Sequence, residues 1–180
     1  MESSPNLLER PRSHPARLPT LSALLAGALL WPACSPSPSP RNTLPPSVVA
    51  AFAKLGTCTL VSLDPARGPT GEAAPAPSLR GNHVLGSVVL SGNSLEAALN
   101  SVRDAVAGWD GQVARCTFQP RHALIYGTPP NETQILICFE CGDVIIFEPT
   151  GETALHVRRH GDASLNELLS ANGIPLASAP

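Results

Sequence analysis

The stretch RHALIYGTPPNETQILICFECGDVIIFEP, residues 121–149, holds three β-favouring runs separated by two turn signals. The runs are residues 121–127, 133–140 and 143–149, and they are rich in Ile, Leu, Val and Phe. GTPPNE separates the first two runs, and Cys141-Gly142 separates the last two. Strands joined by such short connections pair antiparallel, so this stretch predicts an antiparallel meander.

Further elements are predicted upstream and downstream of this meander. Three more β-favouring runs, 57–63, 83–91 and 111–118, bring the expected sheet to about five or six strands. The segment after Gly92 predicts the clearest helix, with Ser94 as N-cap, Gly108 as its end, and an apolar stripe of Leu95, Ala98, Leu99, Val102 and Val106. Weaker helical patterns occupy residues 47–56 and 164–173. The predicted fold is therefore an α+β domain, with a single antiparallel sheet covered by two or three helices.

Prolines divide the chain into a folded part and irregular parts. The chain has 180 residues and 20 prolines, and many of these prolines lie in the first 46 residues. Residues 64–82 contain four Pro and three Gly among few apolar residues, which predicts a long mobile loop. We therefore expect one small domain over residues 47–176 that carries this loop.

The charge of the chain excludes one class of partner. Twelve basic and 14 acidic residues give a net charge of −2, and the basic residues are not clustered with aromatics. Proteins that bind nucleic acids present basic patches, so we expect no nucleic-acid partner.

The amino end has the organisation of an export signal. Arg10, Arg12 and Arg17 precede an apolar run over residues 21–31, which is too short to span about 30 Å of hydrocarbon comfortably. Cys34 follows directly, and residues 1–34 resemble a bacterial lipoprotein signal whose cysteine receives fatty acyl groups such as palmitate. Plain secretion after cleavage near Ala33, an uncleaved anchor and a misassigned start are the alternatives.

The segment that follows this signal suits a tethered protein. Residues 35–46 are rich in Ser and Pro, as expected for a stiff, extended spacer between a lipid anchor and a domain. We therefore expect an extracytoplasmic protein that a lipid anchor holds to a membrane of the cell envelope or periplasm.

Cysteines gather around the predicted meander. Cys138 and Cys141 form a C-x-x-C-G motif typical of a zinc knuckle, and Cys116 with His122 would complete a Cys3His set for structural zinc. The alternatives are buried thiols, one or two disulfides that also involve Cys58, and a redox dithiol. In a regular strand, Cys138 and Cys141 would point to opposite faces, so they meet only if the chain turns between Glu140 and Gly142.

Charged residues beside the cysteines are ligand candidates. Arg121 could bind an anionic group with its planar fork, or pair with Glu140 on the neighbouring strand. His122 could act as a ligand, an acid or base, or a partner of a backbone carbonyl. HVRRHGD, residues 156–162, predicts an edge strand that would place two of its histidines and Arg158 on one face.

One resemblance covers the second half of the domain, roughly from Val84 to Leu176. The pattern CTFQPRHALI…ILICFEC is similar to a group of uncharacterised bacterial proteins, many of them exported, that carry C-F-x-P-R-H and then C-F-x-C. Its residues here are Cys116, Pro120, Arg121, His122, Cys138, Phe139 and Cys141, with Thr117-Phe118 where the group has Phe directly after Cys. The resemblance implies a shared domain and no particular reaction.

Three functions are consistent with these patterns. The first is a non-enzymatic exported lipoprotein whose domain binds a small ligand, a metal or an envelope protein. The second is a structural zinc domain built on the Cys3His set, and the third is a thiol-dependent redox enzyme of the envelope. The sequence contains no G-x-S-x-G, phosphate-binding glycine loop or H-E-x-x-H motif, so more familiar enzyme classes receive no support.

Overall fold

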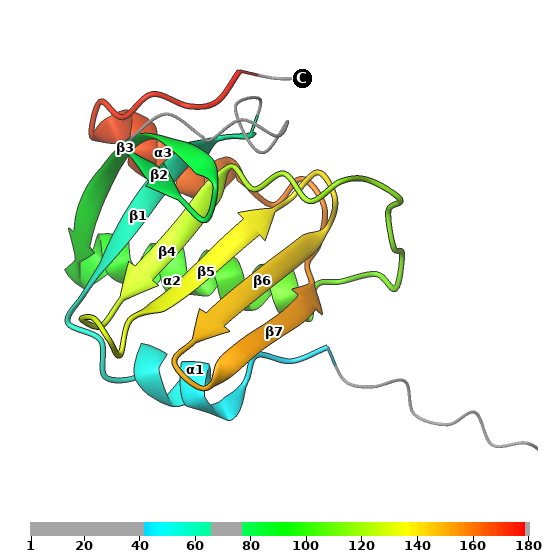
Figure 1. The fold of residues 1–180 in the computed structure, drawn as a ribbon, viewed down its shortest axis with the longest axis horizontal. Helices are drawn as coiled ribbons and strands as arrows, with labels where there is room; N and C mark the ends of the chain where they lie inside the picture. Colours follow the sequence, from blue (N-terminus) through cyan, green and yellow to red (C-terminus); the bar gives the residue numbers. More distant parts are fainter. Residues whose placement is uncertain (1–41, 66–76, 179–180) are drawn as a thin grey trace, which may run out of the picture. The chain divides into compact units, whose positions relative to one another are not determined.

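One antiparallel sheet of seven strands organises the residues that the computed structural model describes, 42–65 and 77–178 (Figure 1). Its strand order is β2-β3-β1-β4-β5-β6-β7. The elements are α1 Pro46–Phe52, β1 Thr57–Asp64, β2 Ser78–Leu79, β3 Asn82–Ser91, α2 Gly92–Ala107, β4 His122–Tyr126, β5 Thr133–Cys138, β6 Asp143–Glu148, β7 Gly151–His156 and α3 Ala163–Ala171. The predicted α+β class with a single antiparallel sheet is confirmed, although the sheet has more strands than expected.

The predicted meander forms the middle of the sheet. β4, β5 and β6 pair antiparallel in sequence order, with Leu124 opposite Ile135 and Ile135 opposite Ile146. These three side chains share one face and are fully buried, because the period of two along each strand directs them to the same side. β7 adds to the outer edge of β6 through the turn at Pro149-Thr150.

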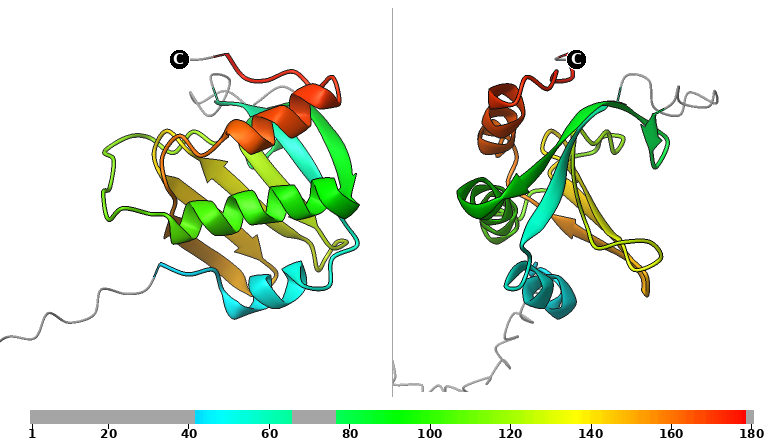
Figure 2. Two further views of the ribbon diagram at one scale, coloured as in Figure 1. Left: turned by 180° about the vertical axis from the view of Figure 1, so that it is seen from behind. Right: turned by 90° about the vertical axis from the view of Figure 1, so that its left-hand side faces the viewer.

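All three helices cover one face of the sheet, as the two views in Figure 2 show. The predicted apolar stripe of α2 is buried there in full, and Val48, Phe52, Leu165 and Leu169 join it from α1 and α3. Burying one such side chain contributes about 1.5–3 kcal/mol, so this layer is the main source of stability. α2 begins at Gly92, two residues before the predicted Ser94 cap. The Ser94 hydroxyl instead donates to the Ser91 carbonyl.

The opposite face carries a smaller apolar cluster of Val61, Leu63, Ala123 and Leu136. The β2–β3 hairpin bends over this face, as the right-hand view of Figure 2 shows. Arg80, in the hairpin turn, donates to Gln134 of β5 at 2.7 Å, and its guanidinium lies 4.1 Å from the ring centre of Phe147 on β6. Arg80 belongs to the hairpin at one edge of the sheet, yet it contacts β5 and β6, which lie beyond β4 in the strand order. The sheet is therefore curled.

Two expectations about strands are wrong. Residues 111–118 form no strand, since β4 is already paired on both sides by β1 and β5 and leaves no edge beside it. The edge strand near the carboxyl end is β7, residues 151–156, and not residues 156–162. The chain turns after His156, so the basic residues beyond it do not share a strand face.

The expected long loop is also shorter than predicted. β1 continues to Asp64, and β2 pairs with the beginning of β3 at Ser78 opposite His83. Residues 66–76 lie outside the described residues, as do the predicted signal, residues 1–34, and residues 35–41 of the spacer. No helix in the described ranges has the length and apolar character needed to cross a membrane.

Candidate functional site

The site candidates from the sequence gather at the end of the sheet where β4 begins and β5 ends. Pro120 has no backbone N–H, and pairing between these strands begins only after it, where the Arg121 N–H donates to the Ile137 carbonyl at 3.2 Å. β5 ends at Cys138, and residues 139–142 turn the chain into β6. Arg121 and His122 therefore lie beside the C-x-x-C turn.

The turn has the geometry that convergence of the two cysteines requires. The Gly142 N–H donates to the Cys138 carbonyl at 2.9 Å, and the Cys141 N–H donates to Sγ of Cys138 at 3.3 Å. Gly142 has a φ of +73°, a left-handed conformation that glycine adopts without strain. Cys141 consequently lies next to Cys138 instead of continuing along β5.

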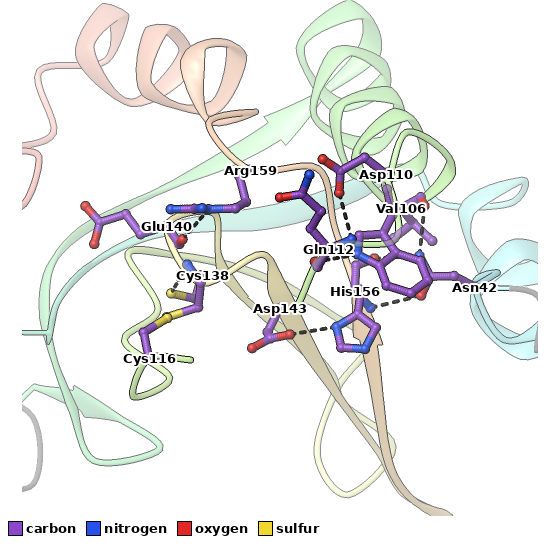
Figure 3. A network of polar contacts seen from close by, with 12 residues as sticks. Asn42, Val106, Asp110, Gln112, Cys116, Cys138, Glu140, Asp143, His156 and Arg159 are labelled. Atoms are coloured by element: carbon purple, nitrogen blue, oxygen red, sulfur yellow. Dashed lines mark hydrogen bonds and ion pairs between the residues drawn. A yellow bond between two sulfur atoms is a disulfide. The ribbon is translucent and has the colours of Figure 1, made fainter. Parts of the chain in front are cut away.

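The four cysteines of the described residues form one disulfide and two free thiols. Cys116 and Cys141 form the disulfide, whose Cα atoms are 5.8 Å apart. Figure 3 draws this disulfide as the yellow bond at Cys116. Cys58 and Cys138 are free and buried. Burial raises the pKa of Cys58, in the core beneath the helices, to about 11, so this thiol is unreactive and has a packing role.

Cys138 has a different environment. Burial is the main reason that its pKa is raised, and the carboxylates of Glu140 and Asp143 raise it further. Two backbone N–H groups, of Gln119 and Cys141, donate to its sulfur and act in the opposite direction. This thiol is therefore protonated at rest but has two donors that can stabilise negative charge on sulfur.

The structure does not assemble the proposed Cys3His zinc set. His122 is opposite Ile137 and shares its face, whereas Cys138, the next residue, points to the other face. Cys116 and Cys141 are bonded to each other and cannot act as thiolate ligands. Within residues 42–65 and 77–178, no group of three or more His, Cys, Asp or Glu side chains is placed to hold a metal ion. The C-x-x-C pair is also not the disulfide, since Cys141 bonds to Cys116.

His122 begins a short chain of side-chain hydrogen bonds on the helix side of the sheet. Its Nε2 lies 2.8 Å from Oδ1 of Asn166, and Nδ2 of Asn166 donates to Asp162 at 2.7 Å. Since the amide nitrogen of Asn166 is used for Asp162, its oxygen is the acceptor, and Nε2 of His122 carries the proton. Asp162, directly before α3, and Asn166 of α3 thus fix the orientation and tautomer of the ring.

The second ring nitrogen of His122, Nδ1, is unusual because its hydrogen-bonding capacity is unused within the described structure. Nδ1 of His122 is buried and has no hydrogen-bond partner among the described residues. Burial lowers the pKa of His122, against opposing effects of Asn166 and Asp162, so the ring is neutral at neutral pH. A neutral ring with its proton on Nε2 presents a lone pair at Nδ1, which is an unused hydrogen-bond acceptor.

Arg121 is held at two of its three nitrogen atoms. Nη2 lies 3.1 Å from Oε1 of Glu140, which is the cross-strand pair expected as an alternative to anion binding, and Nη1 donates to the carbonyl of Ser178 at 2.8 Å. Nε is buried and has no partner among the described residues. Arg121 and His122 together therefore provide one unused donor and one unused acceptor, at adjacent positions of the chain.

Two small pockets adjoin these residues. One, of about 90 Å³, is lined by Arg121, His122, Glu140, His160 and Asp162, among others. The other, of about 60 Å³, shares Arg121, His122 and Asp162, and Leu176 and Ala177 also line it. Pockets for whole drug-sized ligands are typically about 300–1,000 Å³, so these have room only for a small molecule or one functional group.

A second polar network holds the start of the loop that carries Cys116 (Figure 3). Nδ1 of His156 on β7 donates to Oδ1 of Asp143 on β6 at 2.8 Å, and the Trp109 ring stacks on the His156 ring with a centroid distance of 4.6 Å. Asn42 donates to the carbonyls of Val106 and His156 and accepts from the His156 N–H. These contacts fix the residues that follow α2 against the edge of the sheet.

Comparison with known proteins gives no assignment: no family model matches the chain, and no curated protein or solved structure matches it significantly. The sequence patterns point to Arg121, His122, Glu140 and the cysteines, but not to Asn166, the partner of His122, or to Asp162, the partner of Asn166. Their spacing of four residues at the start of a helix is a local signal, and nothing in it points to a histidine 44 residues away.

Proposed function

We propose that this protein is an exported bacterial lipoprotein, anchored through Cys34, whose domain binds a small carboxylate-bearing ligand at the Arg121–His122 pocket. The role is binding and not catalysis. The ligand carries a hydrogen-bond donor, such as a hydroxyl group, beside its carboxylate. A hydroxy acid of a few heavy atoms has this chemistry and suits the volume of about 90 Å³.

The observation that carries the ligand class is the pair of unsatisfied nitrogen atoms. Nε of Arg121 is a charged donor and Nδ1 of His122 a neutral acceptor, and both are buried without partners in the described structure. Leaving such a group unsatisfied costs about 1–3 kcal/mol, so a ligand that satisfies both recovers this cost. A carboxylate complements the arginine, and a neighbouring hydroxyl complements the histidine.

The arrangement around Arg121 supports the same class. Its Nη1 already binds a carbonyl oxygen, that of Ser178, and its Nη2 binds the carboxylate of Glu140. The side chain of Arg121 is 20% exposed and lines both pockets. Charge-assisted hydrogen bonds of this type are stronger than neutral ones, which favours an anionic ligand over a neutral one.

Calorimetric titration of the folded protein with glycolate, acetate and acetamide tests the ligand class. Glycolate should bind most tightly, acetate more weakly, and acetamide least, because each step removes the hydroxyl or the charge. Arg121→Lys retains the charge but loses Nε and the planar fork, so glycolate affinity should fall on the order of tenfold. Arg115→Lys, in the exposed part of the loop, is the matched control and should bind as the parent does. Equal affinity in Arg121→Lys, or no binding of any of the three compounds, contradicts the proposal.

The export part rests on the sequence of residues 1–46 and has its own test. The Cys116–Cys141 disulfide supports it, because disulfides persist mainly in oxidising compartments outside the cytoplasm. Cells that express the full chain in a bacterial host should incorporate labelled palmitate into it, and Cys34→Ser should abolish the label. Incorporation that survives this substitution rules out the lipid anchor at Cys34.

A further inference from the structure

A free thiol and a disulfide share the turn between β5 and β6. Cys138 is 1% exposed and Cys141 4% exposed, and they are the two ends of one four-residue turn. Cys116, the disulfide partner of Cys141, is by contrast exposed and belongs to the irregular segment between α2 and β4. The accessible end of the disulfide is therefore its loop end, and its buried end faces another thiol.

The backbone geometry suits a bond between Cys138 and Cys141. Cα atoms at the two ends of a four-residue turn are less than about 7 Å apart, which is close to the range that disulfides span. The hydrogen bond of 3.3 Å from the Cys141 N–H to Sγ of Cys138 shows that the Cys138 side chain is directed at Cys141. Cys116 and Cys141 meet the same distance condition with Cα atoms 5.8 Å apart. Cys141 can therefore pair with either cysteine without a rearrangement of the sheet.

We propose that Cys116, Cys138 and Cys141 form a thiol–disulfide exchange centre, in which Cys138 displaces Cys116 from Cys141. The Cys138 thiolate attacks Sγ of Cys141, the Cys138–Cys141 bond forms, and the Cys116–Cys141 bond breaks. The bonding electrons leave with Sγ of Cys116, which becomes a thiolate and takes a proton from water, while the proton of Cys138 has gone to water. One disulfide and one thiol are present before and after, so the step needs no oxidant or reductant.

The local groups account for the direction of the attack. The N–H groups of Gln119 and Cys141 both donate to Sγ of Cys138, and they stabilise the thiolate at the moment it forms. Cys141 has the central position, because it is bonded to Cys116 and faces Cys138. Cys58 lies in the apolar cluster on the helix side of the sheet and takes no part in the exchange.

The product is an exposed thiol on a released loop. Cys116 would then attack a low-molecular-weight disulfide, form a mixed disulfide with one half, and release the other half as a thiolate. The segment between Gly108 and Arg121 would keep its contacts at Trp109 but lose its covalent link to the turn. This activity is independent of the proposed ligand, since it uses neither Arg121 nor His122.

Alkylation of the native protein without reductant tests the exchange. The oxidised protein is incubated with iodoacetamide at a pH of about 8.5, near the ordinary thiol pKa, and then mapped by mass spectrometry. The expected product carries the alkyl group on Cys116 and a Cys138–Cys141 disulfide. Alkylation of Cys138 with an intact Cys116–Cys141 disulfide overturns the proposal. That result would mean that local opening of the turn exposes the Cys138 thiol and that this thiol does not exchange with the disulfide.

Two variants and a second probe complete this test. In Cys138→Ala, labelling of Cys116 should slow on the order of tenfold or more, whereas Cys58→Ala should label as the parent does. An aromatic disulfide reagent whose released thiolate absorbs visible light should likewise react at Cys116 in the parent and not in Cys138→Ala. Equal labelling of Cys116 in the parent and in Cys138→Ala, or none in the parent, contradicts the exchange.

Discussion

The backbone N–H of Cys141 donates to Sγ of Cys138 at 3.3 Å, so the two ends of the C-x-x-C motif face each other across one turn. Strand periodicity alone would direct these side chains to opposite faces of the sheet. The left-handed conformation of Gly142 reverses the chain and changes this outcome. The turn, and not the number of cysteines, determines which sulfur atoms can react with one another.

Replacing Gly142 with alanine should destabilise the protein by about 1–3 kcal/mol. The residue has a φ of +73°, and an added Cβ would lie 3.1 Å from the Val157 carbonyl oxygen and 3.1 Å from Cγ of Arg159. Gly56→Ala is the matched control, since its Cβ would meet no atom within 4 Å, and it should cause no loss. Urea unfolding measures the stability of both variants. Equal stability would show that the turn accepts a side chain at position 142 without strain.

Removing the disulfide with Cys116→Ser should lower the free energy of unfolding by about 3.5 kcal/mol. The bond closes a loop with a sequence separation of 25, and loop-closure entropy in the unfolded chain gives this magnitude. Val113→Ser, in the same segment and 63% exposed, should change stability by less than about 0.5 kcal/mol. Urea unfolding of the parent and of both variants without reductant provides the comparison, and similar losses in both variants would mean that the bond constrains little.

The pH dependence of stability should show the burial of His122. Its pKa is lowered from 6.5 in the folded protein, so below pH 6.5 the unfolded chain binds more protons and stability falls as the pH decreases toward the lower folded pKa. This histidine contributes a slope of up to about 1.4 kcal/mol per pH unit in that window. His122→Gln, which keeps a donor toward Asn166, should remove this contribution.

The matched control for His122 is His83→Gln, on a half-exposed position of β3. Urea unfolding of the three proteins between pH 7 and pH 5 compares the slopes. The parent and His83→Gln should share the steeper slope, and His122→Gln should have the shallower one. If His83→Gln has the shallower slope and His122→Gln does not, the acid sensitivity of stability does not come from His122.

The stack between Trp109 and His156 should control the mobility of the segment that carries Cys116. His156→Ala removes the ring under Trp109 and the partner of Asp143, two contacts worth about 1 kcal/mol each. Amide hydrogen exchange should then become faster over residues 109–119 and remain unchanged in β5. Uniformly faster exchange in both regions would indicate global destabilisation instead.

Local patterns in the sequence predicted a large part of the fold. The meander of β4, β5 and β6, the apolar stripe of α2 and the end of that helix at Gly108 follow from periodicity and turn residues. Each is encoded by residues a few positions apart, where side-chain direction depends directly on local conformation. The same reasoning identified the turn at Glu140–Gly142 as the condition for the two cysteines to meet.

The failures concern relationships between distant residues. Residues 111–118 have the composition of a strand, but sheet order leaves no edge beside β4 for them. β7 begins at an exposed glycine, Gly151, and contains no buried residue, so its pairing with β6 is not evident from its own sequence. The proximity of His122 to the cysteines in sequence predicts a zinc ligand, but strand alternation places it on the helix side, where Asn166 binds it.

Residue-resolved NMR of the folded protein titrated with glycolate tests the proposed ligand site most directly. The Nε–H resonance of Arg121 and the imidazole nitrogen Nδ1 of His122 should both shift, saturate with one common affinity, and do so with little change at Arg115. Shifts that are absent at saturating glycolate, or that appear elsewhere while both nitrogen atoms remain unchanged, would contradict the assignment of this pocket as the binding site.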